Sequence, residues 1–393
     1  MSFAVVLVVA WSVLGAISTV LFLYGAVMLV RRCPQLGELE PPAPPSWPAL
    51  SVVVPACNEA RGIEAALGSL LAQDYPDLQI VLIDDRSTDG TGEIADALAA
   101  SDSRLSVVHV RELPAGWLGK VHALQRGVER ACGDWILFTD ADIQFAPQAL
   151  RRAVAWAEAE RLDHVAVLPE LAPPSLWVSA VLTASLRGLF AFLRPWEVND
   201  PDSPKSIGVG AFNLVRRAAF ERTPGFEWLR LEVADDLGLG LMLKRSGARP
   251  GLLLGRGQVR NEGYATLGDA LRGLEKNAFA QGARFAAGRG AALAGLGVVG
   301  AFAPFAAFLP VGVPWLPVVG AVALAIFVVA SVVFTRACRE SPIGVMLSLP
   351  MGDLLMSYVL ARATVLGVLR GGLVWRGTTY PTEMLRAGQR VGM

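Results

Sequence analysis

Two long apolar runs without a charged residue flank the middle of the chain. The first covers Phe3–Val30 and the second covers Ala291–Thr335. A helix rises about 1.5 Å per residue and a bilayer core is about 30 Å thick, so each run is long enough to cross it. The pattern predicts a transmembrane helix over residues 1–32. Because prolines interrupt the second run near its middle, it predicts a helical hairpin over residues 291–335.

A third apolar segment, residues 343–369, contains two charged residues, Asp353 and Arg362. Charges within a bilayer are costly and normally face other protein groups. This segment therefore either spans the membrane with both charges turned inward or lies at the interface. It completes an expected C-terminal membrane region over residues 289–370, and residues 371–393 follow as a tail.

The positions of the arginines predict the orientation in the membrane. Arg31 and Arg32 directly follow the first helix, and Arg289 and Arg336 bound the hairpin. Positive residues next to spanning helices stay preferentially in the cytoplasm. We therefore expect a multi-pass protein of the cell (inner) membrane. Its N-terminus would lie outside, and both the domain after the first helix and the tail would be cytoplasmic.

The segment Pro173–Trp196 is also apolar, but it carries Arg187 and Arg194. Helical spacing gives it a broad apolar side, and arginine side chains are long enough to reach lipid headgroups. We predict an interfacial helix over residues 173–196 that docks the domain between the membrane segments on the cytoplasmic leaflet; a core helix or a further span is the alternative. The expected apolar side consists of Leu176, Val178, Leu182, Leu186, Leu189, Phe190 and Leu193.

Between these membrane segments, short apolar runs alternate with segments of helical length. Six prolines in residues 33–49 suit an extended linker, and a folded domain is expected over residues 50–288. Such alternation is typical of an α/β fold with a mostly parallel sheet covered on both faces. The expected strands are 50–55, 79–83, 105–110, 135–139 and 165–168, with helices such as 63–72 and 91–100 between them.

Polar residues gather where three of the expected strands end. The clusters are Pro-Ala-Cys-Asn-Glu at residues 55–59, Asp-Asp-Arg-Ser-Thr-Asp-Gly-Thr at 84–91 and Asp-Ala-Asp at 140–142. Ligands of open parallel sheets bind beyond the carboxyl ends of the strands. Each cluster alone is also typical of turns and helix caps, but their occurrence together favours a binding site.

Composition narrows the classes of function. Of the 393 residues, 53% are hydrophobic and 18% charged, and the mean hydropathy of +0.46 excludes a single water-facing globule. Lys plus Arg and Asp plus Glu both number 35, so no basic excess indicates nucleic acid as a partner. A membrane transporter is disfavoured because the first helix and the hairpin offer no polar pathway. A non-catalytic scaffold is disfavoured by the acidic clusters.

Six motifs in residues 50–282 resemble family 2 glycosyltransferases of the GT-A fold, and the flanking apolar segments resemble its membrane-bound branch. The motifs follow the order and approximate spacing of that family. The resemblance implies a nucleotide-diphospho-sugar transferase domain with transmembrane helices at both ends. The motifs are SVVVPACNEA, IVLIDDRSTDGT, GWLGKVHAL, WILFTDADI, GVGAFNLVRR and ADDLGLGLMLKRSG.

The resemblance implies a pocket for a nucleotide sugar at the ends of these strands. Carboxylates can accept hydrogen bonds from an imide N–H or from ribose hydroxyls. A basic residue would lie near the diphosphate, although Lys120 is equally typical of a solvated surface and does not fit a P-loop. The implied donor-binding residues are Pro55, Asn58, Glu59, Asp84, Asp85, Lys120 and Asp140.

Asp140 and Asp142 are implied as metal ligands by the same resemblance. Two residues apart on an extended backbone, they point the same way and can present oxygens to one hard cation. The cation would be Mg²⁺ or Mn²⁺. It would stabilise the negative charge that develops on the departing nucleoside diphosphate.

The resemblance also aligns Asp236 with the general base that takes the proton of the acceptor hydroxyl, and places Asp235 where the family has glutamate. An ordinary helix start is the alternative for this pair. Arg272 and Lys276, four apart on one helical face, are candidate contacts to the diphosphate or acceptor, as is Asp235. The two basic residues could equally form a solvated stripe with Glu275.

Two further features indicate the type of transfer. The Gln-x-x-Arg-Trp motif of many processive members is missing at residues 271–277, which disfavours a polysaccharide synthase. Residues 375–380, Trp-Arg-Gly-Thr-Thr-Tyr, resemble an element of membrane enzymes that glycosylate hopanoids, carotenoids and ceramide, with Thr378 in place of arginine. We expect an inverting enzyme that moves one sugar from a UDP-hexose to a membrane lipid hydroxyl. A processive synthase and a nucleotidyltransferase on the same fold are the alternatives.

Overall fold

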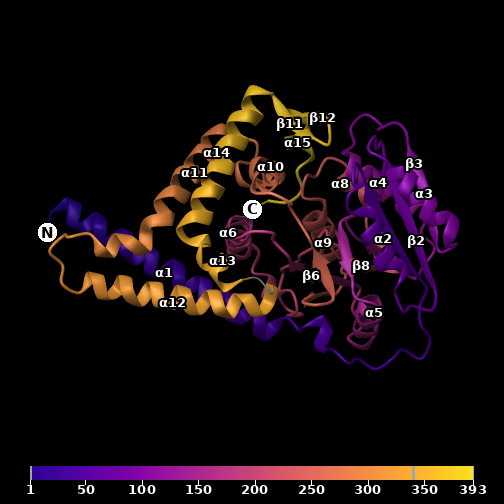
Figure 1. Cartoon of the computed structure of the whole chain (residues 1–393), viewed down its shortest axis with the longest axis horizontal. Helices are drawn as coiled ribbons and strands as arrows, with labels where there is room; N and C mark the ends of the chain where they lie inside the picture. Colours follow the sequence, from indigo (N-terminus) through magenta and orange to yellow (C-terminus); the bar gives the residue numbers. More distant parts are fainter. Residues whose placement is uncertain (1, 339–340, 393) are drawn as a thin grey trace.

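The fold is described from a computed structural model of the chain, which covers residues 2–338 and 341–392. Met1 of the expected first helix, residues 339–340 between the hairpin and the third apolar segment, and Met393 of the expected tail lie outside the described residues. A domain built on a sheet lies at one end of the molecule, and long helices extend from it toward the N-terminus (Figure 1).

A seven-stranded sheet forms the centre of the domain, with the order β3-β2-β1-β4-β8-β6-β9. Adjacent strands of this sheet are parallel, except that β8 is antiparallel to both β4 and β6. The five expected strands are confirmed with small shifts at their ends. The strands are β1 (Leu50–Ala56), β2 (Leu78–Asp85), β3 (Leu105–Val110), β4 (Trp135–Phe138), β6 (His164–Leu168), β8 (Asn213–Arg216) and β9 (Pro250–Leu254).

Helices cover both faces of this sheet, as the continuous apolar strands require. Side chains alternate along β1, so that Val52 and Val54 pack with α2 and α5, whereas Val53 packs with α4 and α9. Helices therefore cover both faces of the sheet. The helices of the domain are α2 (Ile63–Leu71), α3 (Thr91–Ser101), α4 (Gly119–Val128), α5 (Ala149–Ala159), α7 (Arg217–Phe220), α8 (Gly225–Leu229) and α9 (Asp235–Arg245).

Short elements at the edges of the domain were not expected from the sequence. A three-stranded sheet joins β5 (Ile143–Phe145), β10 (Val259–Asn261) and β7 (Glu170–Leu171). The proline-rich linker is also less free than predicted. The carbonyl of Pro34 accepts a 2.9 Å hydrogen bond from the amide of Leu254, and Leu36 in the turn η1 (Leu36–Glu38) is fully buried. The start of residues 33–49 therefore belongs to the fold of the domain.

Five of the described helical segments are long and apolar enough to cross a membrane. α1 packs along α12, whereas α11 packs along α14, so the two helices of the expected hairpin diverge (Figure 1). α1 can pack closely against the expected hairpin because residue 15 is glycine. A Cβ at this position would clash with the backbone of Ala303. The segments are α1 (Phe3–Arg32), α6 (Leu176–Leu193), α11 with η4 (Ala287–Phe308), α12 (Leu316–Cys338) and η5 with α14 (Ser348–Leu369).

α6 lies between the domain and the other apolar helices, packed against α13 (Pro342–Met346), η5 and α14. The side that we predicted to face the membrane is largely turned inward. Phe190 is buried against Phe334, with ring centroids 6.4 Å apart, and Leu182, Leu186 and Leu189 pack against the buried clusters. Exposed apolar side chains lie at the ends of the helix instead, namely Leu176, Trp177 and Phe192.

Arg187 and the two charged residues of the third apolar segment each form an ion pair within the protein. The Arg187 guanidinium forms an ion pair with Asp353 at the start of α14 and donates a 3.0 Å hydrogen bond to Ser348. Arg362, further along α14, pairs with Glu275 of α10 (Leu267–Asn277). The charges of the third apolar segment are thus turned toward protein, and the Arg187–Asp353 pair joins α6 to the C-terminal helices.

We predict that Arg187→Met destabilises the protein by about 2–3 kcal/mol, because it leaves the carboxylate of Asp353 without its cation. This is below the effect for a fully buried pair, since the two side chains are 19% and 20% exposed. The measurement is thermal unfolding of the purified protein in detergent. Arg187→Met combined with Asp353→Leu should recover most of the loss, and the surface variant Arg194→Met should be nearly neutral. Equal stability of the single and double variants would contradict this role.

Candidate active site

A cavity of ≈ 620 Å³ opens beyond the carboxyl ends of β1, β2 and β4. Its walls come from the strand ends on one side and from α6, α10 and α14 on the other. The structure brings most of the predicted site residues to this cavity. Those that line it are Pro55, Glu59, Asp85, Lys120, Asp140, Asp142, Arg272 and Lys276.

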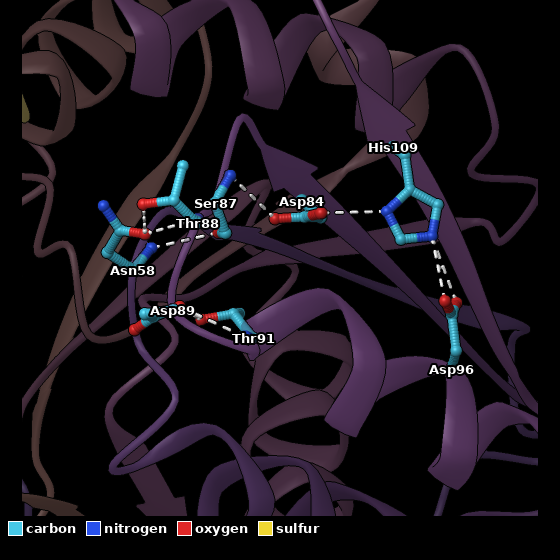
Figure 2. Close-up of polar contacts among 8 residues, drawn as sticks. All are labelled: Asn58, Asp84, Ser87, Thr88, Asp89, Thr91, Asp96 and His109. Atoms are coloured by element: carbon cyan, nitrogen blue, oxygen red, sulfur yellow. Dashed lines mark hydrogen bonds and ion pairs between the residues drawn. The ribbon is translucent and has the colours of Figure 1, made fainter.

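Asn58 does not line the cavity but joins the loops after β1 and β2 (Figure 2). Its side-chain oxygen accepts a 2.8 Å hydrogen bond from the backbone amide of Thr88. Its backbone amide donates a 3.0 Å hydrogen bond to the hydroxyl of Ser87. Its φ of 57° is in the left-handed region, which asparagine tolerates better than most residues. Asn58 therefore shapes the rim of the cavity through its neighbours.

Asp84 also points away from the cavity, toward β3 (Figure 2). Its carboxylate contacts Nδ1 of His109 at 2.8 Å, and Nε2 of the same ring contacts Asp96 at 3.1 Å. These carboxylates raise the pKa of His109, with the hydrogen bond to Asp84 as the largest cause. A direct contact of Asp84 with a nucleotide stays a prediction, and the observed role of this residue is to fix the end of β2.

Asp85 faces the cavity together with Arg86, which sequence reasoning did not identify. The guanidinium of Arg86 donates to both carboxylate oxygens of Asp85, at 2.8 and 2.9 Å, a bidentate geometry that fixes both side chains. Arg86 also donates a 3.4 Å hydrogen bond to the hydroxyl of Thr378. The signal for this role was the position of Arg86 directly after the acidic pair.

Residues 371–393, expected to form only a tail, instead complete the site. The hairpin of β11 (Gly372–Trp375) and β12 (Thr378–Pro381) forms part of the cavity wall. Arg376 at its turn forms an ion pair with Glu59, and Tyr380 accepts a 3.2 Å hydrogen bond from the amide of Gly119. The resemblance of residues 375–380 to a known motif was a signal for function, but no pattern in the sequence placed this hairpin on the cavity.

Arg272, Glu275 and Lys276 on α10 all line the cavity. Glu275 and Lys276 are half-buried there, whereas the Arg272 side chain is 66% exposed and pairs with Asp269 of the same helix. The ammonium of Lys276 lies 3.8 Å from the centre of the Trp375 ring, a cation–π contact with the hairpin. Burial lowers the pKa of Lys276, and the positive charge of Lys120 lowers it further. An anionic group in the cavity would favour the charged form of this lysine.

Lys120 is the central cation of the site. Its ammonium lies 2.6 Å from an oxygen of Asp140 and 3.3 Å from an oxygen of Asp235. Burial alone would lower its pKa, but the neighbouring carboxylates outweigh burial and raise it. Lys120 is therefore a partly buried, firmly charged residue and not a solvated surface lysine.

Asp140 and Asp142 have the chemistry of a site for a hard cation. Burial raises the pKa of Asp142 to about 7, and the negative charges of Asp140 and Glu59 add to this effect. Such crowding of carboxylates is relieved by a divalent cation, which prefers oxygen ligands. Among the described residues no group of three or more potential ligands is present, so two carboxylates would bind the metal together with substrate oxygens and water. That is a usual arrangement for Mg²⁺ with phosphates.

Asp236 occupies a separate recess beside the cavity. The recess has a volume of ≈ 10 Å³, close to the space one water needs, and Pro55, Lys120 and Asp140 line both spaces. The carboxylate of Asp236 accepts hydrogen bonds from the amides of Gly210 at 3.0 Å and Leu237 at 2.8 Å. Burial raises its pKa to about 6, with Asp235 as the next cause.

Glycine at position 210 is required for this arrangement. A Cβ there would lie 2.6 Å from an oxygen of Asp140, while the amide of the same residue binds Asp236. The loop before β8 therefore passes between the implied metal ligand and the implied base. Of the two adjacent carboxylates, Asp235 contacts Lys120, whereas Asp236 shows only the backbone hydrogen bonds among the described groups.

Comparisons with known proteins agree with this geometry. Residues 51–223 match the profile of glycosyl transferase family 2. The uncharacterized glycosyltransferase EpsJ of Bacillus subtilis is 35% identical over 118 residues, which are 30% of this chain and 33% of that protein. The 4,4'-diaponeurosporenoate glycosyltransferase of Staphylococcus aureus is 38% identical over 98 residues, 25% of this chain and 24% of that protein. The matched segments thus span only a quarter to a third of these relatives' own length.

A solved structure resembles nearly the whole chain. A mannosyltransferase from Pyrobaculum calidifontis, determined in complex with GDP-Man and Mn²⁺, superposes with a TM-score of 0.55 over 90% of this chain and 97% of that one. The sequence identity is 21%, so this likeness concerns the fold. Together with the profile match and the strand order, it identifies residues 51–223 as a glycosyl transferase family 2 domain built on the GT-A fold.

Proposed function

We propose that the protein is an inverting glycosyltransferase that moves one hexose from a nucleotide sugar, a UDP-hexose, to the hydroxyl of a membrane lipid. The observation that carries this proposal is the cavity itself. Its lining combines Asp85, Asp140 and Asp142 of the family 2 domain with apolar side chains of helices that are long enough to span a membrane.

The polar side chains of the cavity lining suit the donor. Glu59, Asp85 and Arg86 offer hydrogen-bonding groups for the base and ribose, and Lys120 and Lys276 offer positive charge to the diphosphate. Asp140 and Asp142 would hold Mg²⁺ or Mn²⁺. The metal would supply electrostatic stabilisation of the charge on the leaving nucleoside diphosphate. The Pyrobaculum structure, solved with GDP-Man and Mn²⁺, supports this assignment.

The apolar part of the cavity lining suits a lipid acceptor. The apolar lining includes Leu182 of α6, Leu366 of α14, and Phe279, which follows α10. On the same helix as Leu366, Val365, Val368 and Leu369 are exposed, and Leu369 is 77% exposed. Apolar side chains both in the cavity wall and on the surface of this helix would let a lipid present its hydroxyl without leaving the bilayer. The Staphylococcus relative, named for 4,4'-diaponeurosporenoate, supports this class of acceptor.

The side chains of the recess can carry out the transfer. Asp236 takes the proton of the acceptor hydroxyl, whose oxygen then attacks the anomeric carbon from the face opposite the diphosphate. The carboxylate is suited to this task because its pKa of about 6 makes it ionised near neutral pH and still basic enough to accept a proton. Lys120 keeps Asp140 and Asp235 in place beside the reacting groups. The cytoplasmic orientation proposed above would give the cavity access to nucleotide sugars.

Product analysis tests this function directly. The purified protein, incubated with labelled UDP- and GDP-hexoses, a divalent cation and a total membrane lipid extract, should form one labelled lipid that carries a single sugar. Mass spectrometry identifies the sugar and the lipid. A ladder of products would instead show a processive synthase, and a nucleotide attached to the product would show a nucleotidyltransferase. Absence of any labelled lipid with all donors would contradict the proposal.

We predict that Asp236→Asn lowers kcat by about 10²–10⁴-fold, the usual contribution of a positioned general base, while donor affinity changes little. In the wild type, kcat should fall as the pH drops below about 6, because protonated Asp236 cannot accept a proton. The measurements are pH profiles of transfer and equilibrium binding of the donor. Near-normal turnover of Asp236→Asn would show that another group takes the proton.

Asp142→Asn should weaken metal-dependent donor binding at least about tenfold, the loss that even outer-shell changes cause at metal sites. The reason is that the amide cannot replace the anionic ligand that a hard cation prefers. Donor binding is measured by calorimetry with and without a chelator, and Asp74→Asn on the surface is the matched control. Donor binding that is indifferent to the chelator would disprove the metal site.

A further inference from the structure

Glu232 is a carboxylate buried just before the proposed base. It is 1% exposed and lies in the loop that leads into α9, whose first residues are Asp235 and Asp236. A carboxylate taken out of water is costly unless hydrogen bonds replace the lost hydration. In the described part of the chain its hydrogen bonds come from amide groups and not from a cationic side chain.

Each carboxylate oxygen of Glu232 accepts two hydrogen bonds. Oε1 accepts from the amide of Ala234 at 3.0 Å and from Nε2 of Gln281 at 3.2 Å. Oε2 accepts from the backbone amides of Arg390 at 2.5 Å and Val391 at 2.9 Å. One side chain therefore joins the start of α9, the segment η3 (Ala278–Gly282) and residues 389–391, which we name the C-terminal strap.

The strap has its own anchors on the domain. Gln389 donates a 3.0 Å hydrogen bond to the carbonyl of Ala280, and the guanidinium of Arg390 donates to the carbonyl of Trp228 at 3.2 Å. Val391 is buried. These contacts present two consecutive backbone N–H groups to Glu232 in a fixed geometry, so the strap supplies donors that no side chain of the loop provides.

The carboxylate in turn fixes the residues that carry the proposed chemistry. Ala234 precedes the first turn of α9, and its amide is bound by Glu232. Glu232 also packs on this turn, since a Cβ at position 238 would lie 3.2 Å from its Cγ. A shift of Glu232 would therefore move the backbone of Asp235 and Asp236, and misplacement by about 1 Å can lower turnover a hundredfold.

We propose that Glu232 and the C-terminal strap are positioning elements that hold Asp236 in its recess. Neither touches the cavity, and both act through the backbone at the start of α9. The inference rests on the proposed role of Asp236 as the base. The inference has a structural part, namely that the strap orders residues 233–237. This part can be tested without any measurement of activity.

The donors of the strap are backbone N–H groups, so a proline substitution can remove one of them. Val391→Pro deletes the N–H that binds Glu232, whereas Val391→Ala loses side-chain packing but keeps the N–H. Glu232→Gln replaces one acceptor oxygen by an NH₂ group that faces N–H donors. Its matched control is Glu227→Gln, a change at an exposed glutamate of the same region.

Hydrogen exchange and kinetics then measure the two halves of the proposal. Amides of residues 233–237 should exchange at least about tenfold faster in Val391→Pro and Glu232→Gln than in the two controls, because their anchor is lost. With the donor and lipid identified by product analysis, kcat of the same two variants should fall about ten- to a hundredfold, while the donor KM stays unchanged. A merely structural role would lower stability and leave kcat per folded enzyme unchanged.

The outcomes separate failure of this inference from failure of the proposed function. If no glycolipid forms with the wild type, the exchange measurement still tests whether the strap orders the start of α9. Exchange in Val391→Pro that equals that in Val391→Ala would overturn the ordering role. Faster exchange together with an unchanged kcat would overturn the positioning of Asp236.

Discussion

The ammonium of Lys120 is the charge on which the arrangement of the site depends. Asp140 comes from the end of β4, and Asp235 comes from the start of α9 on the other side of a loop. Without a cation between them, these carboxylates and Asp236 would repel one another at close range in a partly buried space. Lys120 sits at the start of α4, so a single side chain connects three elements of the domain.

This central cation also explains how the neighbouring acidic residues differ in character. Asp235 is in contact with the lysine, whereas Asp236 is turned toward two backbone amides and burial raises its pKa to about 6. Burial also raises the pKa of Asp142 to about 7, and the negative charges of Asp140 and Glu59 raise it further. Environments that separate the pKa values of adjacent carboxylates allow them to take different tasks.

Local patterns were sufficient to predict the sheet, because apolar strands and their polar ends repeat over short distances. The five expected strands and the polar ends of β1, β2 and β4 are confirmed by the structure. Long-range partners were not predictable from such patterns. Arg187 stands alone in an apolar stretch of the sequence, and Asp353, its partner in the ion pair, is 166 residues away. The hairpin of residues 372–381 likewise reaches the cavity only through tertiary packing.

The inward face of α6 shows a second limit of prediction from sequence. Helical periodicity identified the apolar side of this helix, but it does not show whether such a side faces lipid or other helices. Phe190 packs on Phe334 of α12, and the helix exposes its ends instead. In the same way, Asp84 was recognised as the end of a strand, while its contact with His109 depends on the register of β2 against β3.

The position of the β11–β12 hairpin and the strap in the chain has a consequence for biosynthesis. Both follow the apolar helices in sequence, and both contact residues of the domain that precede those helices. During translation the family 2 domain therefore emerges from the ribosome well before the segments that line its cavity and bind Glu232 emerge. The nascent domain can form its sheet early, but the hairpin and the strap can pack on it only after the long apolar helices have been synthesised, so the cavity wall and the contacts of Glu232 form late.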